Sequence, residues 1–257
     1  MARSYLRTSE VAEAVGVHPN TVRMYEVWGL LPPIPRTPSG YRKFTAVHVD
    51  QMRLARLVFD GPWPGRAIRR SAVVLVKQAA VGDLGGALEG AYRHLVVVQA
   101  EHAQAESAVR LLERWAQGTA ADATQTPLSI GKVADLLGVT RDMLRNWERN
   151  NLICVPRNPK NGYRRYAATE ISRLRVIRML RQAGYSPMAI LRMPAQLDEG
   201  ASAGDLRMAL DTPRPDEDVY SAADQWLTSL VDWERRAEEI IAHLEGMIGR
   251  QQSAVRE

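Results

Sequence analysis

Apolar residues recur at helical spacing in two short stretches that lie far apart in the chain. The first, SEVAEAVG at 9–16, and the second, IGKVADLLG at 130–138, both end at a glycine, which is a common helix stop. A turn follows each stretch, and a second amphipathic run begins behind it, at 21–28 and at 143–150. Two short helices joined by a glycine-containing turn are typical of a helix-turn-helix. The pattern therefore predicts this motif twice.

A glycine-led segment rich in basic and aromatic residues comes after each predicted motif. It reads GYRKF at 40–44 and GYRRY at 162–166, and Pro159 and Asn161 ahead of the second copy favour a tight turn. Each segment is therefore predicted to form a small hairpin, or wing. Beyond the second wing, apolar residues recur every three positions and predict a third helix that ends at Gly184: Ile171, Leu174, Ile177 and Leu180.

A fourth helix is indicated after the third in each copy. Ser186 and Pro187 suit the cap and the first residue of such a helix in the second copy. The equivalent stretch of the first copy, FDGPWPGR at 59–66, is irregular. The fourth helix of the first copy is therefore expected to begin later or less firmly.

The chain repeats itself at an offset of 122 residues, the distance from Gly40 to Gly162. Matching pairs extend from Val11 and Val133 past the wings and need no gap. A period of this length indicates a duplicated domain with its connector rather than a solenoid. We expect a mainly α-helical protein with four parts: a winged helix-turn-helix domain at 1–70, a connector with a long pairing helix at 71–126, a second winged domain at 127–194, and an acidic connector with a second pairing helix at 195–257.

Both connectors carry an apolar seam with alternating spacings of three and four, the pattern of a helix that packs along another helix. The seam in 84–116 is Leu88, Ala91, Leu95, Val98, His102, Ala105, Val109 and Leu112, and the seam in 221–250 is Trp226, Leu230, Trp233, Ala237, Ile240, Leu244 and Met247. The two large indoles could fill space beside Ala91 and Ala105. Antiparallel pairing of the two helices would form a coiled coil and let one chain imitate a dimer. An ordinary homodimer with four winged domains is the alternative.

Charge is distributed unevenly along the chain. Residues 1–70 hold 11 Lys and Arg against 5 Asp and Glu, and residues 127–194 hold 13 against 4. The two connectors are acidic, although the whole chain carries a net charge of +5. Basic charge confined to the two predicted winged domains indicates a polyanionic partner. Solvated helix faces are the alternative.

The order of these features resembles the MerR family of bacterial transcription regulators. The resemblance rests on the helix-turn-helix, the RMYE and RNWE motifs at 23–26 and 145–148, the wing and the helix pair behind it. It covers about 8–70 and 129–194. It implies that each second helix enters the major groove of double-stranded promoter DNA and that the wing lies on the flanking backbone. It also implies pairing through a long helix, and distortion of a badly spaced promoter so that RNA polymerase can read it.

Lys, Arg and Tyr side chains are the expected phosphate contacts, because phosphate neutralisation dominates affinity for DNA. On the wings and second helices these are Arg23, Tyr25, Tyr41, Arg42, Lys43, Arg145, Trp147, Tyr163, Arg164 and Arg165. Tyr25 and Trp147 could instead pack against the first helix of each copy. Arg23 and Arg145 could instead pair with the glutamate three residues further on.

Base reading is expected at the start of each second helix. The candidate residues are His18, Asn20 and Thr21 in the first copy, and Thr140, Arg141 and Asp142 in the second. Asn suits adenine and Arg suits guanine, so these sets predict an operator with unlike halves. The alternative is that these residues only cap helices, a role that suits Thr140 in any case.

No sensing site is evident in the sequence, and no metal or cofactor is expected. The single cysteine, Cys154, excludes an internal disulfide and a cysteine-cluster metal site, and we expect it to be a small buried apolar residue. The segment 211–226 has no counterpart in the first copy. Its Tyr220 and Trp226, together with Trp233, form a possible pocket for a cationic ligand. A solvated acidic linker is the alternative.

An enzyme is not expected, since no nucleophilic triad or phosphate-cradling glycine loop appears and the five histidines are scattered. The first residues do not form a signal peptide, and the apolar run at 72–81 is too short to span a bilayer. We therefore expect a cytoplasmic, nucleoid-associated regulator. The competing functions are a small-molecule sequestering protein of MerR-like descent and an architectural DNA binder without an effector.

Overall fold

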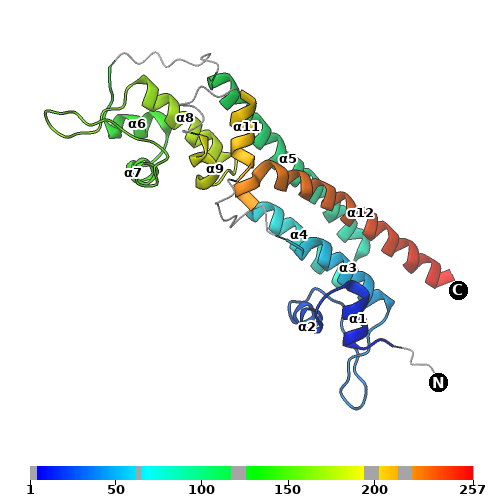
Figure 1. The fold of residues 1–257 in the computed structure, drawn as a ribbon. Helices are drawn as coiled ribbons and strands as arrows, with labels where there is room; N and C mark the ends of the chain where they lie inside the picture. Colours follow the sequence, from blue (N-terminus) through cyan, green and yellow to red (C-terminus); the bar gives the residue numbers. More distant parts are fainter. Residues whose placement is uncertain (1–4, 62–64, 117–125, 194–202, 214–221, 257) are drawn as a thin grey trace. The chain divides into compact units, whose positions relative to one another are not determined.

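The computed structural model describes residues 5–61, 65–116, 126–193, 203–213 and 222–256, which form helices joined by loops (Figure 1). The chain divides into two compact units. Unit 1 comprises Met1–Gln99 and Val231–Glu257, and unit 2 comprises Ala100–Leu230. Each unit contains one winged helix-turn-helix, called a head below. The long helices α5 (Leu84–Ala116) and α12 (Trp226–Arg256) contribute to both units.

The first head consists of α1 (Thr8–Val15), α2 (Pro19–Val27) and α3 (Ala46–Phe59). α1 ends where Gly16 adopts a φ of 69°, a left-handed conformation that glycine enters without steric cost. α2 begins at Pro19, whose ring presets φ and whose missing N–H needs no partner in the first turn. The apolar faces of the three helices meet in a core that includes Val11, Val22, Met52 and Leu54.

The second head repeats this arrangement with α6 (Ile130–Leu137), α7 (Arg141–Arg149) and α8 (Ala168–Gln182). Gly138 ends α6 with a φ of 60°, as Gly16 ends α1. A short helix, α9 (Pro187–Leu191), follows, and Ser186 caps it by accepting the N–H of Ala189 at 3.0 Å. The helices predicted from apolar spacing are therefore confirmed in both copies.

The helix after the third differs between the copies. In the first copy it is α4 (Arg66–Ala80), which begins after Gly65 without a side-chain cap, as the irregular sequence predicted. It begins only one residue later than the offset of 122 would give, and it runs for 15 residues where α9 has 5. Its buried face, which includes Leu75 and Val76, extends the core of unit 1 beyond the head.

The wings differ from the predicted repeat in the offset between the two copies. Isolated bridges pair Arg36 with Arg42 in the first wing and Arg157 with Arg164 in the second. Arg157 follows Arg36 at an offset of 121 rather than 122, so the second wing is one residue longer and the loop before it one residue shorter. The gap-free match was therefore wrong in this region, because two single-residue shifts cancel.

Within unit 1, the beginning of α5 and the C-terminal part of α12 run in opposite directions. Leu84 lies beside Met247 around one cavity, whereas His94, further along α5, meets the ring of Trp233 with 6.1 Å between centroids. Ala91 of α5 and Leu244 of α12 share the buried cluster of this unit. Antiparallel packing of the two helices is thus present inside unit 1.

Within unit 2, the beginning of α12 is attached to the second head. The indole Nε1 of Trp226 donates to the carbonyl of Ala183 at 2.7 Å, and a Cβ added to Gly184 would lie 2.7 Å from the indole ring. Asp211, at the end of α11 (Ala203–Asp211), accepts the N–H of Leu227 at 2.8 Å. A 3-10 turn, η1 (Ala222–Gln225), precedes α12.

The predicted seams are largely buried. All the seam residues of α12 are buried, and the same holds for most of the α5 seam: Ala91, Val98, Ala105, Val109 and Leu112. Leu88, Leu95 and His102 are half-buried. The contacts found for the two indoles involve His94, Ala183 and Gly184, and their placement beside Ala91 and Ala105 stays a prediction.

Candidate nucleic-acid interface

The start of each second helix is exposed and locally capped. His18 Nδ1 accepts the N–H of Asn20 at 3.2 Å, and Thr140 Oγ1 accepts the N–H of Met143 at 3.1 Å. Each cap satisfies a backbone N–H in the first turn of its helix, so the side chains around it rather than the free N–H groups are available to a ligand. The candidate base-reading residues are exposed except for Thr21, which is half-buried: His18, Asn20, Thr140, Arg141 and Asp142.

The two reading helices share an internal contact. Arg23 donates to Asn20 Oδ1 at 2.9 Å, and Arg145 donates to Asp142 Oδ1 at 2.8 Å, in both cases three residues back. Pairing with the glutamate three residues further on, the alternative from the sequence, is not among the contacts found for either arginine. Both guanidinium groups thus remain on the exposed face, and Asp142 offsets one positive charge there.

A glutamate on each reading helix holds both strands of the wing. Glu26 accepts a hydrogen bond from Arg42 Nε at 2.6 Å and lies 3.4 Å from Arg36. Glu148 accepts one from Arg164 Nε at 2.6 Å and lies 3.8 Å from Arg157. We call these two arrangements the wing braces. Each brace fixes the wing to the helix that lies beside it.

The wing braces qualify the expected role of Arg42 and Arg164. Their side chains are only about a quarter exposed, at 25% and 26%, and one donor of each is committed to a glutamate. Their contact with phosphate stays a prediction for the remaining guanidinium N–H groups. Arg36 and Arg157, which the sequence analysis did not select, are the more exposed partners of the same glutamates.

The tips of the wings present aromatic and basic side chains to solvent. Tyr41 is 71% exposed and Tyr163 is 74% exposed, and Arg165 is exposed as well. Lys43 is half-buried, with its ammonium group 5.7 Å from the centre of the Tyr5 ring. Phenol hydroxyls and cations in such positions are suited to phosphate oxygens.

Tyr25 and Trp147 are the clear departures from the expected DNA contacts. Only 6% of Tyr25 and 5% of Trp147 is exposed, so both rings belong to the core of their heads. Tyr25 lies against Phe59, with 5.6 Å between ring centres, and burial raises the pKa of its hydroxyl. The structure favours the packing interpretation of both residues.

The proposed cation pocket gains no support from the described residues. Tyr220 lies outside them, and Trp226 and Trp233 are both buried. Trp226 is engaged with Ala183, and Trp233 packs edge-on against His94. Cys154 is exposed, which corrects the expectation that it is buried.

The wing braces are the functional feature that sequence reasoning missed. The sequence contains the residues that form them: Glu26 and Glu148 end the RMYE and RNWE motifs, and an arginine precedes each wing turn, at 36 and at 157. The sequence analysis pairs these glutamates only with the arginines of their own helices. The one-residue shift in the wing also hid the equivalence of Arg36 and Arg157.

Comparison with known proteins bears on both heads. A model of the MerR HTH family regulatory protein matches residues 6–61 and 128–197. The mercuric resistance operon regulatory protein of Bacillus cereus is 35% identical over 57 residues, which are 22% of this chain and 43% of that relative. The HTH-type transcriptional regulator CueR of Escherichia coli O6:H1 is 32% identical over 59 residues, which are 23% and 44% of the two chains.

The chain spans less than half the length of these curated relatives. No solved structure matches it significantly. None of the helices in the described part of the chain has the length and apolar character needed to cross a membrane. The family match falls on both copies of the fold described above. The domains of that family belong to transcription regulators and not to enzymes. The chain therefore carries, in tandem, two helix-turn-helix DNA-binding domains of the MerR family.

Proposed function

We propose that this protein is a transcription regulator that reads two unlike half-sites of a promoter with the two heads of one chain. The observation that carries the proposal is the wing brace, which occurs in both heads with the same 2.6 Å contact. A brace of this kind sets the wing at a fixed position beside the reading helix. An exposed helix start and an exposed basic wing can then meet the groove and the adjacent backbone of one duplex together.

Phosphate binding supplies most of the affinity in this proposal. Each head offers exposed cations on its reading helix, Arg23 in the first and both Arg141 and Arg145 in the second, and an exposed tyrosine on its wing. Each cation that neutralises a phosphate adds to the salt dependence of binding. The relatives named above are called regulators, which supports the same activity for this chain.

The unlike half-sites follow from the unlike reading sets. Asn20 can form a bidentate pair with adenine, although its Oδ1 already accepts from Arg23. Arg141 can form a bidentate pair with guanine. A duplicated chain is free to vary one set without the other, which a homodimer of identical heads cannot do.

One chain is proposed to act as a pseudo-dimer. The support is the antiparallel packing of α5 and α12 in unit 1, which a dimer of single-headed chains would have to form between two molecules. The bound promoter would be distorted for RNA polymerase, and the protein would act in the cytoplasm at the nucleoid. Light scattering of the free protein tests this arrangement: a stable particle of twice the 28.7 kDa chain mass contradicts it.

Footprinting on the DNA upstream of the protein's own coding sequence tests the DNA-binding activity. We expect protection of two adjacent half-sites of different sequence, with affinity that falls steeply as salt rises. Protection that is independent of sequence would indicate an architectural DNA binder. Absence of binding to any duplex at low salt would leave the sequestering function as the better explanation.

A further inference from the structure

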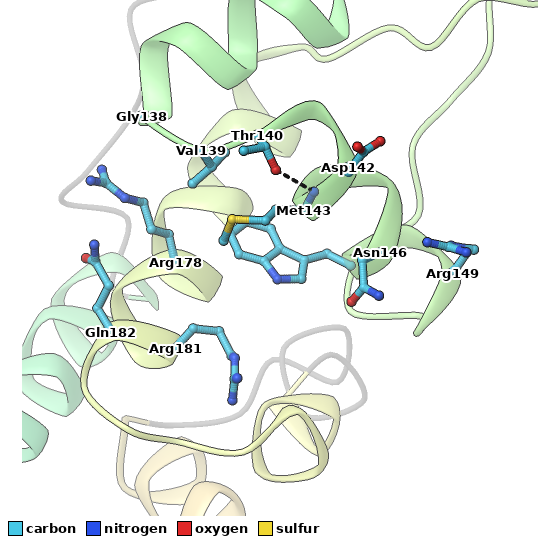
Figure 2. A pocket seen from close by; sticks show the side chains of 11 residues that line it. Gly138, Val139, Thr140, Asp142, Met143, Asn146, Arg149, Arg178, Arg181 and Gln182 are labelled. Atoms are coloured by element: carbon cyan, nitrogen blue, oxygen red, sulfur yellow. Dashed lines mark hydrogen bonds between the residues drawn. The ribbon is translucent and has the colours of Figure 1, made fainter. Parts of the chain in front are cut away.

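A groove lies beside the reading helix of the second head. It has a volume of about 640 Å³ and lies between α7 and α8 in unit 2. Figure 2 shows Met143 on α7 directed towards α8, while the guanidinium groups of Arg178 and Arg181 extend from α8 in different directions. The buried ring of Trp147 also contributes to its wall.

Aromatic rings occupy the corresponding place in the first head. Phe59 lies 5.6 Å from Tyr25 and 6.1 Å from Trp28, measured between ring centres, and the three rings form one cluster. At the offset of 122, Arg181 replaces Phe59 and Asn150 replaces Trp28. The second head therefore lacks two of the three rings that fill this place in the first.

The charge of the two places differs as well. In the first head, Arg56 donates to the carbonyl of Val15, and its Nε lies 3.9 Å from the carboxylate of Asp60. Its counterpart is Arg178, and the counterpart of Asp60 is Gln182, which carries no charge. At these two positions the second head has lost one negative charge and gained the positive charge of Arg181, although Asp142, which replaces the neutral Asn20, adds a carboxylate to the lining of the groove.

The two arginines of the groove lack a carboxylate partner among the described residues. The buried Nε of Arg178 has no hydrogen-bond partner there. Arg181 donates to the carbonyl of Tyr185 at 2.5 Å, and burial lowers the pKa of its guanidinium group. The two guanidinium groups extend from α8 in different directions (Figure 2), so each one offers its own place for an anion at the edge of the groove.

We propose that this groove binds a small organic anion with a planar apolar body, such as an aromatic carboxylate. Arg181 pairs with the anionic group, and Met143 and the edge of Trp147 that lines the groove contact the body. Guanidinium groups form charge-assisted hydrogen bonds with carboxylates, and thioether and indole groups pack well on planar rings. The apolar wall distinguishes such a ligand from a bare phosphate of the DNA backbone.

Binding here would act on the second head, because the rings of Tyr25, Trp28 and Phe59 occupy the corresponding place in the first. The groove is formed by the same α7 that carries Thr140, the cap of the reading helix. A ligand would therefore change recognition at the second half-site while leaving the first unaffected. This consequence rests on the proposed function, whereas the binding site itself does not.

Calorimetric titration of the full chain with naphthalene-2-carboxylate, in the absence of DNA, tests the site. A ligand of this size in an open groove is expected to bind with a dissociation constant on the order of 0.1–1 mM. Arg181→Phe, which restores the ring of the first head, should weaken binding at least about tenfold, and Arg178→Gln should weaken it less, because its guanidinium group points to another side of the groove. Lys132→Gln removes one positive charge from the exposed surface of α6 and should change binding less than about twofold.

Two further ligands sharpen the result. Neutral naphthalene-2-methanol should bind at least about tenfold more weakly than the carboxylate, since the charged hydrogen bonds are missing. Inorganic phosphate should bind more weakly as well, because it leaves the apolar wall unused.

Several outcomes would overturn the proposal: no binding of the carboxylate, unchanged binding by folded Arg181→Phe, or equal binding of the neutral alcohol. Phosphate that binds as tightly as the carboxylate would assign the groove to a DNA phosphate and would also overturn the organic ligand. Because the titration contains no DNA, failure of the DNA-binding proposal would not change the interpretation of the titration.

Discussion

The first and second heads have the same helices and the same wing brace, yet they fill the space beside their reading helices differently. The first uses the cluster of Tyr25, Trp28 and Phe59, and the second has a groove lined by Arg178 and Arg181. The position of the wing is thus maintained by the same ion pairs in both copies, while the packing behind the reading helix has diverged. Duplication allows this, because one copy can retain a compact core while the other acquires a different surface.

The two units also differ in their buried histidines. Unit 1 contains His94, which is fully buried in α5 with Nδ1 2.7 Å from Ser71 Oγ, and His48, which is buried at the start of α3. Burial lowers the pKa of both imidazoles. Unit 2 has a single histidine, His102, which is half-buried. The units should therefore respond differently to acid.

Lowering the pH should give the largest difference between the units. Burial lowers the pKa of His94 to about 4, whereas an unfolded histidine has a pKa of about 6.5. Between these values the unfolded chain binds more protons, so the stabilisation due to His94 is complete above pH 6.5 and is lost as the pH falls towards 4. The full loss amounts to about 3 kcal/mol.

Hydrogen exchange at pH 7.5 and pH 5, corrected for the intrinsic exchange rate, can measure this loss separately in each unit. Amides of α4 and α5 near His94 should lose protection that amides of α8 retain. His94→Leu is the control, because Ser71 keeps its hydrogen bond to the carbonyl of Ile68 at 3.0 Å. If the variant loses as much protection as the original protein, the histidine is not the cause.

Truncation of the residue that differs most between the heads should give the next largest effect. Phe59→Ala removes a half-buried ring from the cluster with Tyr25 and Trp28, which should lower the free energy of unfolding of unit 1 by about 2 kcal/mol. Arg181→Ala, at the equivalent position, should change the free energy of unfolding of unit 2 by about 0.5 kcal/mol or less. Local opening free energies from hydrogen exchange measure both. Equal losses would show that the two places are packed alike.

Breaking a wing brace should reduce the specificity of the head that contains it. Glu26→Gln or Glu148→Gln releases Arg42 or Arg164 and removes a negative charge near DNA. Non-specific affinity should therefore not fall, while the ratio of specific to non-specific affinity falls by about tenfold as the wing loses its fixed position. Fluorescence anisotropy with each half-site and with random DNA measures this ratio.

The charge-matched control for this experiment is Glu13→Gln on α1, which should leave the ratio unchanged. Arg165→Ala should lower the salt slope by about one, as expected for a phosphate contact. If Arg42→Ala and Arg164→Ala leave both the affinity and the salt slope unchanged, these arginines do not contact phosphate. An unchanged ratio in both glutamine variants would contradict the role of the braces.

The helices were predictable because their signals are local. Gly16 and Gly138 end helices through their own backbone freedom, and Ser186 caps α9 through its own hydroxyl. The roles of Tyr25 and Trp147 were not predictable, since an aromatic ring with a polar atom suits both a core and a phosphate. Only the packing of α3 and α8 against the reading helices decides between these environments.

The features that depend on pairs of distant residues were the hardest to predict. A wing brace joins residues that are 16 apart in sequence, and the groove beside α7 results from replacements on two helices at once. The repeat itself held the information, because comparison of the copies places Phe59 opposite Arg181 and Asp60 opposite Gln182. The consequence of those replacements becomes visible only when the neighbouring rings are located.

The smallest expected effect concerns the left-handed residue after each reading helix. Gly29 has a φ of 67°, and its counterpart Asn151 has a φ of 58°, the one positive value for a non-glycine residue in the described part of the chain. Asn tolerates this conformation better than most residues but less well than Gly. Asn151→Gly should therefore stabilise unit 2 by about 0.5 kcal/mol, after the greater flexibility of unfolded glycine is allowed for.

The reverse change, Gly29→Asn, should destabilise unit 1 by a similar amount. No atom lies within 4 Å of a Cβ built on Gly29, so the cost is conformational and not steric. Gly29→Ala, which lacks the local hydrogen bonding of Asn, should cost about 1 kcal/mol. Hydrogen exchange of α2 and α7 measures these differences. A loss well above 1 kcal/mol for Gly29→Asn would mean that the two reading helices end in different surroundings, and that the likeness of the heads stops before the wing.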